Sequence, residues 1–541
     1  MNPGDGERLL LPMRILLVAL IPLLAGFAAK PASARVPGDI AAAGPRTAAV
    51  DLTGYSEIRY VSAAAADDSG DGSRSRPWRS VAAAVARLGG SPSQRVAVLV
   101  AAGTYADATV VMREHVDLFG GFSAATWARD IFAHESVLDG RHVRRVVLAA
   151  NHARLDGFVI TRGRALGPGG ALLCDGTSPT ITNNRLEQSF TVTPAGFRHD
   201  RIHQAGHMGG AVACLYESVP VIAHNLFRGN HTEIGEGGAL AVWGWHRLPG
   251  NPRATIEHNV FVGNTSGLAD HARTRSSSGG AVAFSHEASP ILRHNIVAQN
   301  RAMGRSDAGG LYCEYFSSPT IEHNWIVGNE GDDDGGGLYT MRQGEPLIRH
   351  NLFAGNWTTM GGIGGIRISK EGRARIVDNH IVFNQSGGGV YMADGYVVLE
   401  GNIIADNRKG PAVRLQQNFP YFQPSRVEGN RFLRNEEGAV VVTKVVGSAP
   451  VQKDNQVKDG PARAPAARWT ITRARFDPRR GQTSVEVAGA PAPAPGLAGA
   501  TVWTGTRWGV IATVAGNTLM VWGDLAPGGS AAELFLLPEY P

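Results

Sequence analysis

Residues 318–329 read SPTIEHNWIVGN: a short apolar run, an asparagine, a second apolar run and another asparagine. Pairs of asparagines with this spacing recur along the chain, and their first members are Asn225, Asn259, Asn295, Asn324, Asn351, Asn379, Asn402 and Asn430. A repeat with a constant core and variable gaps predicts a solenoid, in which each repeat is one coil. The apolar runs are short, rich in Val and Ile and bounded by Gly, Pro and Asn, so we expect strands and not helices.

The asparagines have a structural explanation. Identical amides on successive coils can hydrogen-bond along the solenoid axis and to the backbone of the turns, as in other asparagine ladders. A histidine precedes the first asparagine in five coils, at His224, His258, His294, His323 and His350. We expect these rings to stack at a turn and not to bind metal, because metal ligands must converge on a point and not on a line.

The N-terminus has the features of an export signal. Arg14 precedes the apolar run 15–27, and Ala32-Ser33-Ala34 forms a small-x-small cleavage site. That run is too short to be a comfortable membrane span, and no later stretch qualifies. We therefore expect no membrane span in the mature chain, which should be secreted or periplasmic.

The sequence suggests six regions. We expect a signal peptide at 1–34, a low-complexity linker at 35–56, an N-terminal cap with a helix near Ser80–Leu88 at 57–95, a parallel β-helix at 96–447, a linker at 448–467 and a small β domain or cap covering the last coil at 468–541. A cap is expected because the end of a solenoid exposes unpaired backbone. The predicted fold class is all-β.

Three cysteines cannot all pair with one another. Cys174 and Cys214 each fall four residues after the glycine that opens a repeat, which places them on neighbouring rungs of one column. Adjacent strands lie about 4.8 Å apart, so a disulfide is geometrically possible there. Two small residues stacked without a bond are the alternative.

Alternation of side chains along the first strand of each coil assigns one column to the outside. Aligned from the glycine pair that opens each repeat, this column contains Leu172, Val212, Leu240, Val282, Tyr312, Tyr339, Arg367 and Tyr391. The column changes from aliphatic to aromatic and basic along the axis. Long insertions enter before the same strand, and loops on a rigid scaffold are where solenoids place binding and catalysis.

Charged residues concentrate on that edge. The candidate catalytic residues are Glu314, Asp307, Asp333, Asp334, Arg367 and Lys370, and the candidate substrate-binding residues are Tyr312, Tyr339, Tyr391, Arg342, Trp243 and Trp245. Paired carboxylates can act as acid and base on a glycoside, and one tyrosine on each rung can stack on sugar rings. The plainer interpretations are solvated polar turns and aromatic pairs that stabilise the sheet.

No cofactor is certain from the sequence. The candidate metal ligands are Asp332, Asp333, Asp334 and Glu236, and the candidate ion is Ca²⁺, which prefers oxygen ligands. In that alternative the ion neutralises a substrate uronate while an Arg, Lys or Tyr removes a proton.

Two segments resemble a known family. Residues 59–88 (RYVSAAAADDSGDGSRSRPWRSVAAAVARL) with 96–105 (VAVLVAAGTY) resemble the N-terminal cap of secreted pectate-lyase-like, right-handed parallel β-helix proteins, and SPTIEHNWIVGN resembles their repeat. The resemblance covers about residues 57–445 and implies a right-handed, single-stranded parallel β-helix. That superfamily includes polysaccharide lyases, glycoside hydrolases, epimerases and non-catalytic proteins, and no catalytic motif transfers residue by residue.

Two functional hypotheses follow. In the first, the chain is a carbohydrate-active enzyme, a lyase or hydrolase that cleaves a polysaccharide in a groove along the first-strand face. In the second, it is a non-catalytic carbohydrate-binding or cell-surface solenoid. The formal net charge of +5 is a mild excess that is compatible with an acidic polysaccharide. We expect no nucleic-acid partner, and the oligomeric state stays open.

Overall fold

The computed structural model describes residues 40–193, 207–244, 252–268, 277–420, 423–488, 493–525 and 533–538. The predicted signal peptide lies outside these residues. Within them, no helix has the length and apolar character needed to cross a membrane.

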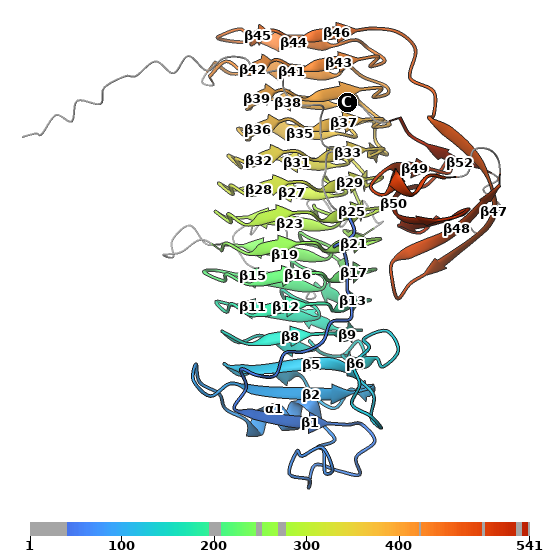
Figure 1. Ribbon diagram of the computed structural model, residues 1–541. Coiled ribbons are helices and arrows are strands. Elements are labelled where there is room, and N and C mark those ends of the chain that lie inside the picture. The colour runs from blue at the N-terminus through green and yellow to red at the C-terminus, as the bar shows by residue number, and fades with distance from the viewer. Residues whose placement is uncertain are drawn as a thin grey trace, which may run out of the picture. The chain divides into compact units, whose positions relative to one another are not determined.

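The chain winds into a parallel β-helix whose coils stack along one axis (Figure 1). In each coil the chain passes through a first, a second and a third sheet, and in the middle coils through a short fourth sheet before the next coil begins. The predicted all-β parallel β-helix is confirmed.

The first sheet carries the predicted functional face. In hydrogen-bonded order its strands are β4 (Val110–Val111), β7 (Val147–Leu148), β11 (Leu172–Asp175), β15 (Val212–Leu215), β19 (Leu240–Trp243), β23 (Val282–Ser285), β27 (Leu311–Cys313), β31 (Leu338–Thr340), β35 (Ile366–Ser369), β38 (Val390–Ala393), β41 (Val413–Gln417) and β44 (Val440–Val445).

The second sheet begins in the N-terminal cap. Its strands are β1 (Glu57–Val61), β2 (Val96–Ala101), β5 (Val116–Phe122), β8 (Arg154–Asp156), β12 (Thr180–Thr182), β16 (Val221–Ala223), β20 (Thr255–Glu257), β24 (Ile291–Arg293), β28 (Thr320–Glu322), β32 (Leu347–Arg349), β36 (Arg373–Val377), β39 (Tyr396–Glu400), β42 (Arg426–Glu428) and β45 (Val451–Lys453).

The third sheet lies between the two asparagines of each repeat. Its strands are β3 (Gly103–Tyr105), β6 (Ser136–Asp139), β9 (Phe158–Thr161), β13 (Arg185–Glu187), β17 (Leu226–Arg228), β21 (Val260–Val262), β25 (Ile296–Ala298), β29 (Trp325–Val327), β33 (Leu352–Ala354), β37 (His380–Val382), β40 (Ile403–Ala405), β43 (Arg431–Leu433) and β46 (Gln456–Lys458).

The fourth sheet forms where the sequence indicated loops. Its strands are β10 (Arg164–Leu166), β14 (Phe190–Val192), β18 (His231–Thr232), β22 (Thr265–Ser266), β26 (Arg301–Ala302), β30 (Glu330–Gly331) and β34 (Trp357–Thr358). Its strands are two or three residues long, and such short runs give no alternation pattern to recognise in the sequence.

The asparagine ladder has the predicted form. Asn324 accepts hydrogen bonds at Oδ1 from the backbone N–H (2.9 Å) and the side-chain amide (3.0 Å) of Asn295. Its own amide donates to Asn351 Oδ1 at 3.0 Å and to the Leu292 carbonyl at 2.9 Å. These amides are fully buried, so the ladder satisfies buried backbone groups at every turn.

The histidines stack as expected. Successive rings from His224 to His350 lie face to face with centroids 5.0 to 5.1 Å apart. The cysteines also lie as placed: Cys174 and Cys214 are register partners in β11 and β15, and both are buried and unbonded.

The assignment of the outer column was wrong in the first four coils. Val282 pairs with Leu311 and Ala283 with Tyr312, so the outward column reads Leu173, Ala213, Ala241, Ala283, Tyr312, Tyr339, Arg367 and Tyr391. In later coils a glycine takes the place of the alanine that precedes the strand. Glycine is needed there because a Cβ on Gly310 would lie only 2.5 Å from the Gly337 carbonyl oxygen. Since the alignment was counted from the glycine pair, this extra glycine shifted it by one residue.

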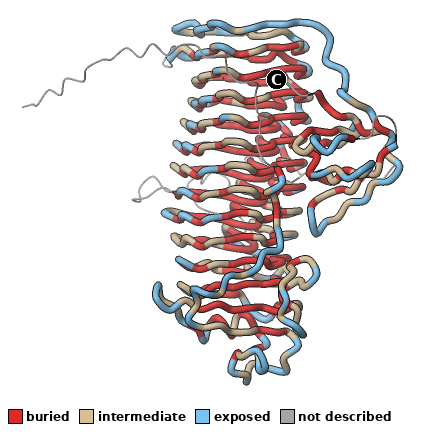
Figure 2. The backbone as a smooth tube through the Cα atoms, viewed as in Figure 1, coloured by how far each residue is buried: buried red, intermediate tan, exposed pale blue. Residues whose placement is uncertain are grey.

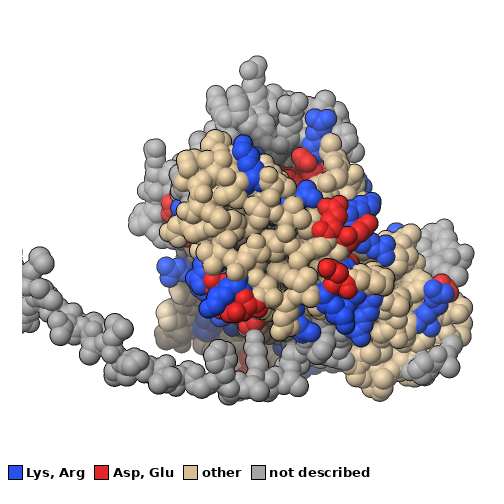
Figure 3. All heavy atoms as spheres, turned by 90° about the horizontal axis from the view of Figure 1, so that it is seen from above, with Lys and Arg blue, Asp and Glu red and all other residues tan. Residues whose placement is uncertain are grey.

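The two ends of the β-helix differ from each other: the first is capped and the last is exposed. The N-terminal cap contains α1 (Val81–Arg87), whose N-cap Ser80 accepts a hydrogen bond from the Ala83 N–H, as the predicted helix near Ser80–Leu88 requires. At the other end the strands continue to Lys458, beyond the predicted boundary at 447. This last coil is more exposed than the coils below it (Figure 2), and seen from above it is largely uncharged, with charged side chains around its rim (Figure 3).

The predicted C-terminal β domain is a closed antiparallel barrel. Its strands are β47 (Ala467–Asp477), β48 (Gln482–Ala488), β51 (Thr518–Trp522), β50 (Trp508–Ala515), β49 (Thr501–Trp503) and β52 (Glu533–Leu536). Trp508 and Trp522 pack in one buried cluster with Trp325 and Val260 of the third sheet. The barrel therefore packs on the side of the β-helix. It does not cover the last coil as expected, where Val442, Val451 and Val457 stay exposed.

Candidate functional site

The predicted charged residues lie on the outer face of the first sheet. Most come from the turns immediately before or after β19, β27, β31 and β35, where glycines bring the chain out of the fourth sheet. Two groups of carboxyls form there. The dyad consists of Glu236 and Glu314, and the aspartate cluster consists of Asp307, Asp333 and Asp334.

Glu314 follows β27 and accepts hydrogen bonds from donors on three strands or turns. Arg342 Nη1 lies 2.8 Å from Glu314 Oε2, the Tyr312 hydroxyl 2.9 Å from the same oxygen, and the Ser285 hydroxyl 3.3 Å from Oε1. Only 2% of Glu314 is exposed. A buried carboxylate needs such donors, because an unpaired buried charge is strongly destabilising.

Glu236 completes the dyad from a turn two coils away. The residue keeps intermediate exposure, and its carboxyl lies near enough to Glu314 and Ser285 to interact with both. Burial, and then the negative charge of Glu314, raise the pKa of Glu236 well above its usual value. Glu236 therefore holds its proton more tightly than a free glutamate does, beside a carboxyl held by Arg342. Environments that separate two carboxyls in this way are typical of acid/base sites.

The aspartate cluster, one coil further along, also combines a carboxyl of raised pKa with a carboxyl that pairs with an arginine. Burial, and then the charges of Asp334 and Asp333, raise the pKa of Asp307 to about 8. Asp334 lies 3.3 Å from Arg367 Nε. Asp333 is exposed as a whole residue. The pKa of Asp333 is nevertheless raised, first because its carboxyl is partly shielded from water and second because of the charge of Asp334. The cluster thus places a neutral acid beside an ion-paired carboxylate.

Arg367 joins the aspartate cluster to an aromatic ring. Its guanidinium carbon lies 3.7 Å from the centroid of the Tyr391 ring, and the Tyr391 hydroxyl donates to Gln416 at 2.7 Å. Such cation–π contact fixes a guanidinium against an aromatic face. Lys370 is exposed, and its positive charge opposes the rise in the pKa of Asp307.

The predicted aromatic strip is corrected in part. Tyr312 and Tyr339 are only 4% and 3% exposed because Ala308 and Met341 pack over them, so neither presents a ring face to a sugar. Trp243 is buried, with its ring 4.7 Å from the His286 ring. Tyr391 keeps intermediate exposure, and Trp245 lies outside the described residues.

Tyr312 connects the two groups of carboxyls. Burial, and then the charges of Glu314, Glu236 and Asp307, raise the pKa of Tyr312 well above its usual value. Burial, and then the charge of Asp307, do the same to Tyr339. Both tyrosines therefore stay protonated hydrogen-bond donors and make poor proton-abstracting bases.

The predicted calcium ligands are not brought together. Asp332 is buried and stabilises the neighbouring turns, because it accepts hydrogen bonds from the Gly304 N–H at 2.6 Å and the Thr359 hydroxyl at 2.9 Å. Glu236 instead lies in the dyad. Across the part of the chain that the structure describes, no three His, Cys, Asp or Glu side chains are arranged to hold a metal ion.

Sequence reasoning missed two members of the site. Ser285 ends β23 and His286 follows it; both are buried, and the Ser285 hydroxyl lies 2.7 Å from His286 Nδ1. No repeat pattern singles them out. Their only sequence signal is that a serine takes the outward position that Trp243 has in the coil before.

The sequence matches two family descriptions. Residues 167–364 match "Right handed beta helix region", and residues 278–460 match "Periplasmic copper-binding protein (NosD)". Copper favours convergent imidazole or thiolate ligands. The stacked histidines form a line, and the two neighbouring thiols point into the core, with Cys313 three coils beyond Cys214. The described residues therefore do not fit a resident copper ion.

Two solved structures match the chain at low identity. "The complex structure of XylC with xylose" is 10% identical, with a TM-score of 0.41, over 79% of this chain and 89% of that chain. The native "GH136 lacto-N-biosidase from Eubacterium ramulus" is 12% identical, with a TM-score of 0.32, over 74% of this chain and 68% of that chain. No curated protein matches the chain.

Proposed function

The chain is a right-handed parallel β-helix protein, and from that premise we propose that it is a glycoside hydrolase acting on a polysaccharide outside the cytoplasm. The observation that carries the proposal is the dyad, in which Glu314, held by Arg342 and Tyr312, interacts with Glu236 and raises its pKa. Glycoside hydrolysis needs one carboxyl to give a proton and another to act on water or on the sugar.

The dyad suits the role of proton donor. Glu236 and Glu314 interact directly, so we assign both to this one role. The second function must then come from another carboxyl, about 5 to 9.5 Å away. Glu236 then gives its proton to the leaving glycosidic oxygen as the bond to the anomeric carbon breaks. Arg342 holds the negative charge that remains on the dyad.

The aspartate cluster suits the second function. Asp334, paired with Arg367, takes a proton from the water whose oxygen bonds to the anomeric carbon. Asp333, exposed at the rim, assists in positioning that water. Proton exchange with solvent restores both groups after each turnover, so the reaction consumes only water and the glycosidic bond.

A lyase is the second candidate, and the geometry favours it less. A lyase must abstract a carbon-bound proton from a uronate, and the tyrosines on this face are held in their protonated form by buried surroundings. The aspartate cluster without assembled calcium ligands also adds negative charge where a uronate carboxylate would need neutralisation.

The test is a panel of neutral and acidic glycans incubated with the mature chain, with and without chelator. New reducing ends without unsaturated products support the hydrolase; unsaturated products that absorb in the ultraviolet indicate the lyase. Product from no glycan leaves the non-catalytic binding protein as the better description.

The residue test compares two glutamates. Glu314→Gln should lower kcat by about 10²–10⁴-fold, because it removes the carboxylate that Arg342 and Tyr312 hold. Glu322→Gln is the matched control, since Glu322 also pairs with an arginine, Arg349 at 2.6 Å, but on the second sheet. Equal activity in the two variants, both folded by thermal melting, contradicts the proposed site.

A further inference from the structure

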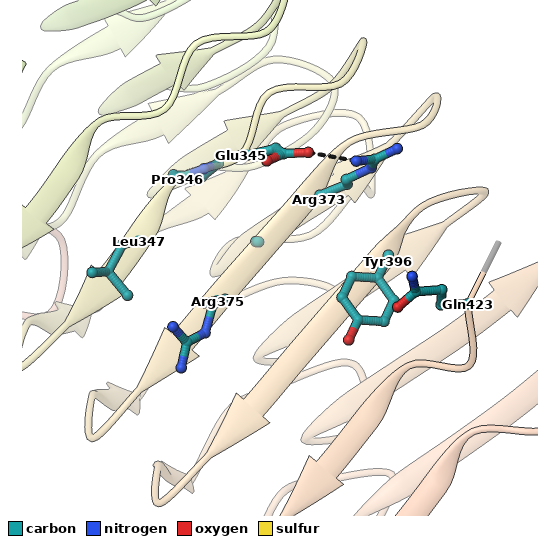
Figure 4. A pocket seen from close by; sticks show the side chains of 8 residues that line it. Glu345, Pro346, Leu347, Arg373, Arg375, Tyr396 and Gln423 are labelled. Carbon is teal, nitrogen blue, oxygen red and sulfur yellow. Dashed lines mark hydrogen bonds and ion pairs between the residues drawn. The ribbon is translucent and has the colours of Figure 1, made fainter. Parts of the chain in front are cut away.

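A hollow lies on a different face of the β-helix, on the second sheet. It has a volume of about 410 Å³ and is formed on the second sheet by residues at and before the starts of β32, β36, β39 and β42 (Figure 4). This size falls within the range of about 300–1,000 Å³ that is usual for ligand pockets. The carboxyls of the first sheet take no part in it.

The hollow arises where the repeat changes. The strand register places Glu345, Arg373 and Tyr396 in one outward column that continues from Ser289 and Ser318 of earlier coils. Ser289 and Ser318 are followed by proline, whereas Arg373 is followed by Ala374 and Tyr396 by Val397. Three long side chains thus replace short ones, and Leu347 and Ala374 line the hollow beside them.

The polar groups around the hollow are of two kinds. Glu345 and Arg373 satisfy each other, with Oε1 and Nη1 2.6 Å apart. Arg375, the Tyr396 hydroxyl and the exposed Gln423 amide have no side-chain hydrogen bond or ion pair within the described residues. In Figure 4, Arg373 and Arg375 project from one strand and Tyr396 from the next.

These groups define a ligand chemistry. An aromatic ring beside amide and guanidinium donors suits a sugar, which has an apolar ring face and hydroxyl edges. The Glu345–Arg373 pair is neutral as a unit, so Arg375 leaves one uncompensated positive charge. A guanidinium pairs best with a planar carboxylate.

We propose that this hollow is a glycan-anchoring site that binds a sugar unit carrying a carboxylate. Arg375 pairs with that carboxylate, the Tyr396 ring packs on the sugar face, and Gln423 hydrogen-bonds to hydroxyls. The site holds a polysaccharide on the second sheet and needs no chemistry on the first sheet.

The test is calorimetric titration of the mature chain carrying Glu314→Gln, in which turnover should be slow enough not to consume the probe. The probes are a tetramer of galacturonic acid and the neutral tetramer of galactose. The acidic tetramer should bind, and the neutral one at least about tenfold more weakly, a difference of one charge-assisted contact. Absence of acidic-tetramer binding at millimolar concentration, or equal binding of both, overturns the proposal.

Variants locate the binding. Arg375→Ala and Tyr396→Ala should each weaken binding of the acidic tetramer by at least about tenfold, and Tyr396→Phe should retain it because the ring remains. Arg293→Ala, which removes a second-sheet arginine paired with Glu257 at 2.6 Å and remote from the hollow, is the control. Unchanged binding in Arg375→Ala and Tyr396→Ala places the ligand elsewhere and overturns the site.

The two proposals fail separately. If no glycan is cleaved but binding depends on Arg375, the hydrolase is wrong and the anchoring site stands. If Glu314→Gln abolishes cleavage while Arg375→Ala leaves acidic-tetramer binding intact, the anchoring site is wrong and the hydrolase stands.

Discussion

Asp307 shows how the chemistry of this face arises at the scale of one residue. An aspartate in water is ionised at neutral pH, yet burial and two neighbouring aspartates raise the pKa of Asp307 to about 8. The same two causes, burial and a like charge, act on Glu236. The raised pKa values in the candidate site therefore come from the surroundings of each carboxyl and not from the residue type.

Asp307 makes stability depend on pH. Its folded pKa of about 8 exceeds the unfolded value of about 3.9, so the folded state binds more protons between these values. Stability must then fall as pH rises from about 4 to about 8, with a slope of up to about 1.4 kcal/mol per pH unit from this residue. Asp307→Asn should remove that slope, as urea unfolding at a series of pH values would show.

Glu322→Gln is the control for that series, since the structure places Glu322 in a surface ion pair with Arg349. A wild-type slope retained in Asp307→Asn would mean that Asp307 is ionised in the folded protein.

At the scale of the element, the ladder matters more than any single strand. Strands of the third sheet are mostly three residues long, too short to be stable alone. Each buried asparagine links its coil to both neighbours, as Asn324 does with Asn295 and Asn351. The ladder also holds the register, because a shift of one residue would leave buried amides unpaired.

Asn324→Ala should cost about 2–4 kcal/mol of unfolding free energy. The change removes the acceptor of the Asn295 N–H and side-chain amide and leaves the Leu292 carbonyl without its donor, all in a dry interior. Urea denaturation followed by circular dichroism measures the loss.

Asn455→Ala is the matched variant. Asn455 makes the same bonds to Asn430 and Val427 at the open end of the ladder, but it is only partly buried. Water can replace those bonds, so we expect a loss of about 1 kcal/mol or less. Equal losses at both positions would argue against burial as the source of the stabilisation.

At the scale of the whole molecule, repeat positions that look equivalent have different roles. Gln299 takes the position that Gly328 and Gly355 have in later repeats, and its amide donates to the Trp508 carbonyl at 2.6 Å while accepting from the Asp524 N–H at 2.8 Å. Gly328 and Gly355 lie under the Trp508 indole. Gln299, Gly328 and Gly355 therefore form part of the β-helix surface on which the barrel packs.

Gly355→Ala should loosen the barrel. Gly355 has φ of 64°, and a Cβ there would lie 2.2 Å from Trp508 Cδ2. Gly263 has the same φ of 64° with nothing within 4 Å of its Cβ position, so Gly263→Ala carries the backbone strain alone. Overpacking should cost Gly355→Ala about 1–3 kcal/mol more, with a red shift of tryptophan fluorescence.

Thermal melting and limited proteolysis of residues 459–466 compare these two variants. If Gly263→Ala destabilises the protein as much as Gly355→Ala, strain and not contact with Trp508 explains the effect.

The site was predictable in its location and not in its detail. Glu314 and Tyr312 were identified because they depart from the apolar pattern of one strand, and Arg342 because the repeat alignment places it in the next coil. Ser285 and the link between Glu236 and Glu314 were not, because they depend on side chains from three coils meeting. Tyr339 was expected to be exposed, and only the packing of Ala308 and Met341 explains its burial.

The sequence by itself determined the coils, the asparagine ladder, the N-terminal helix and the separate C-terminal β domain, because alternation, turn residues and repeat spacing act over a few residues. Tertiary structure decided the rest: the register of the early coils, the side on which the barrel docks, and the raised pKa values of Glu236 and Asp307. Those properties depend on which side chains meet across coils and on how far water is excluded between them. The sequence of a single repeat does not show either.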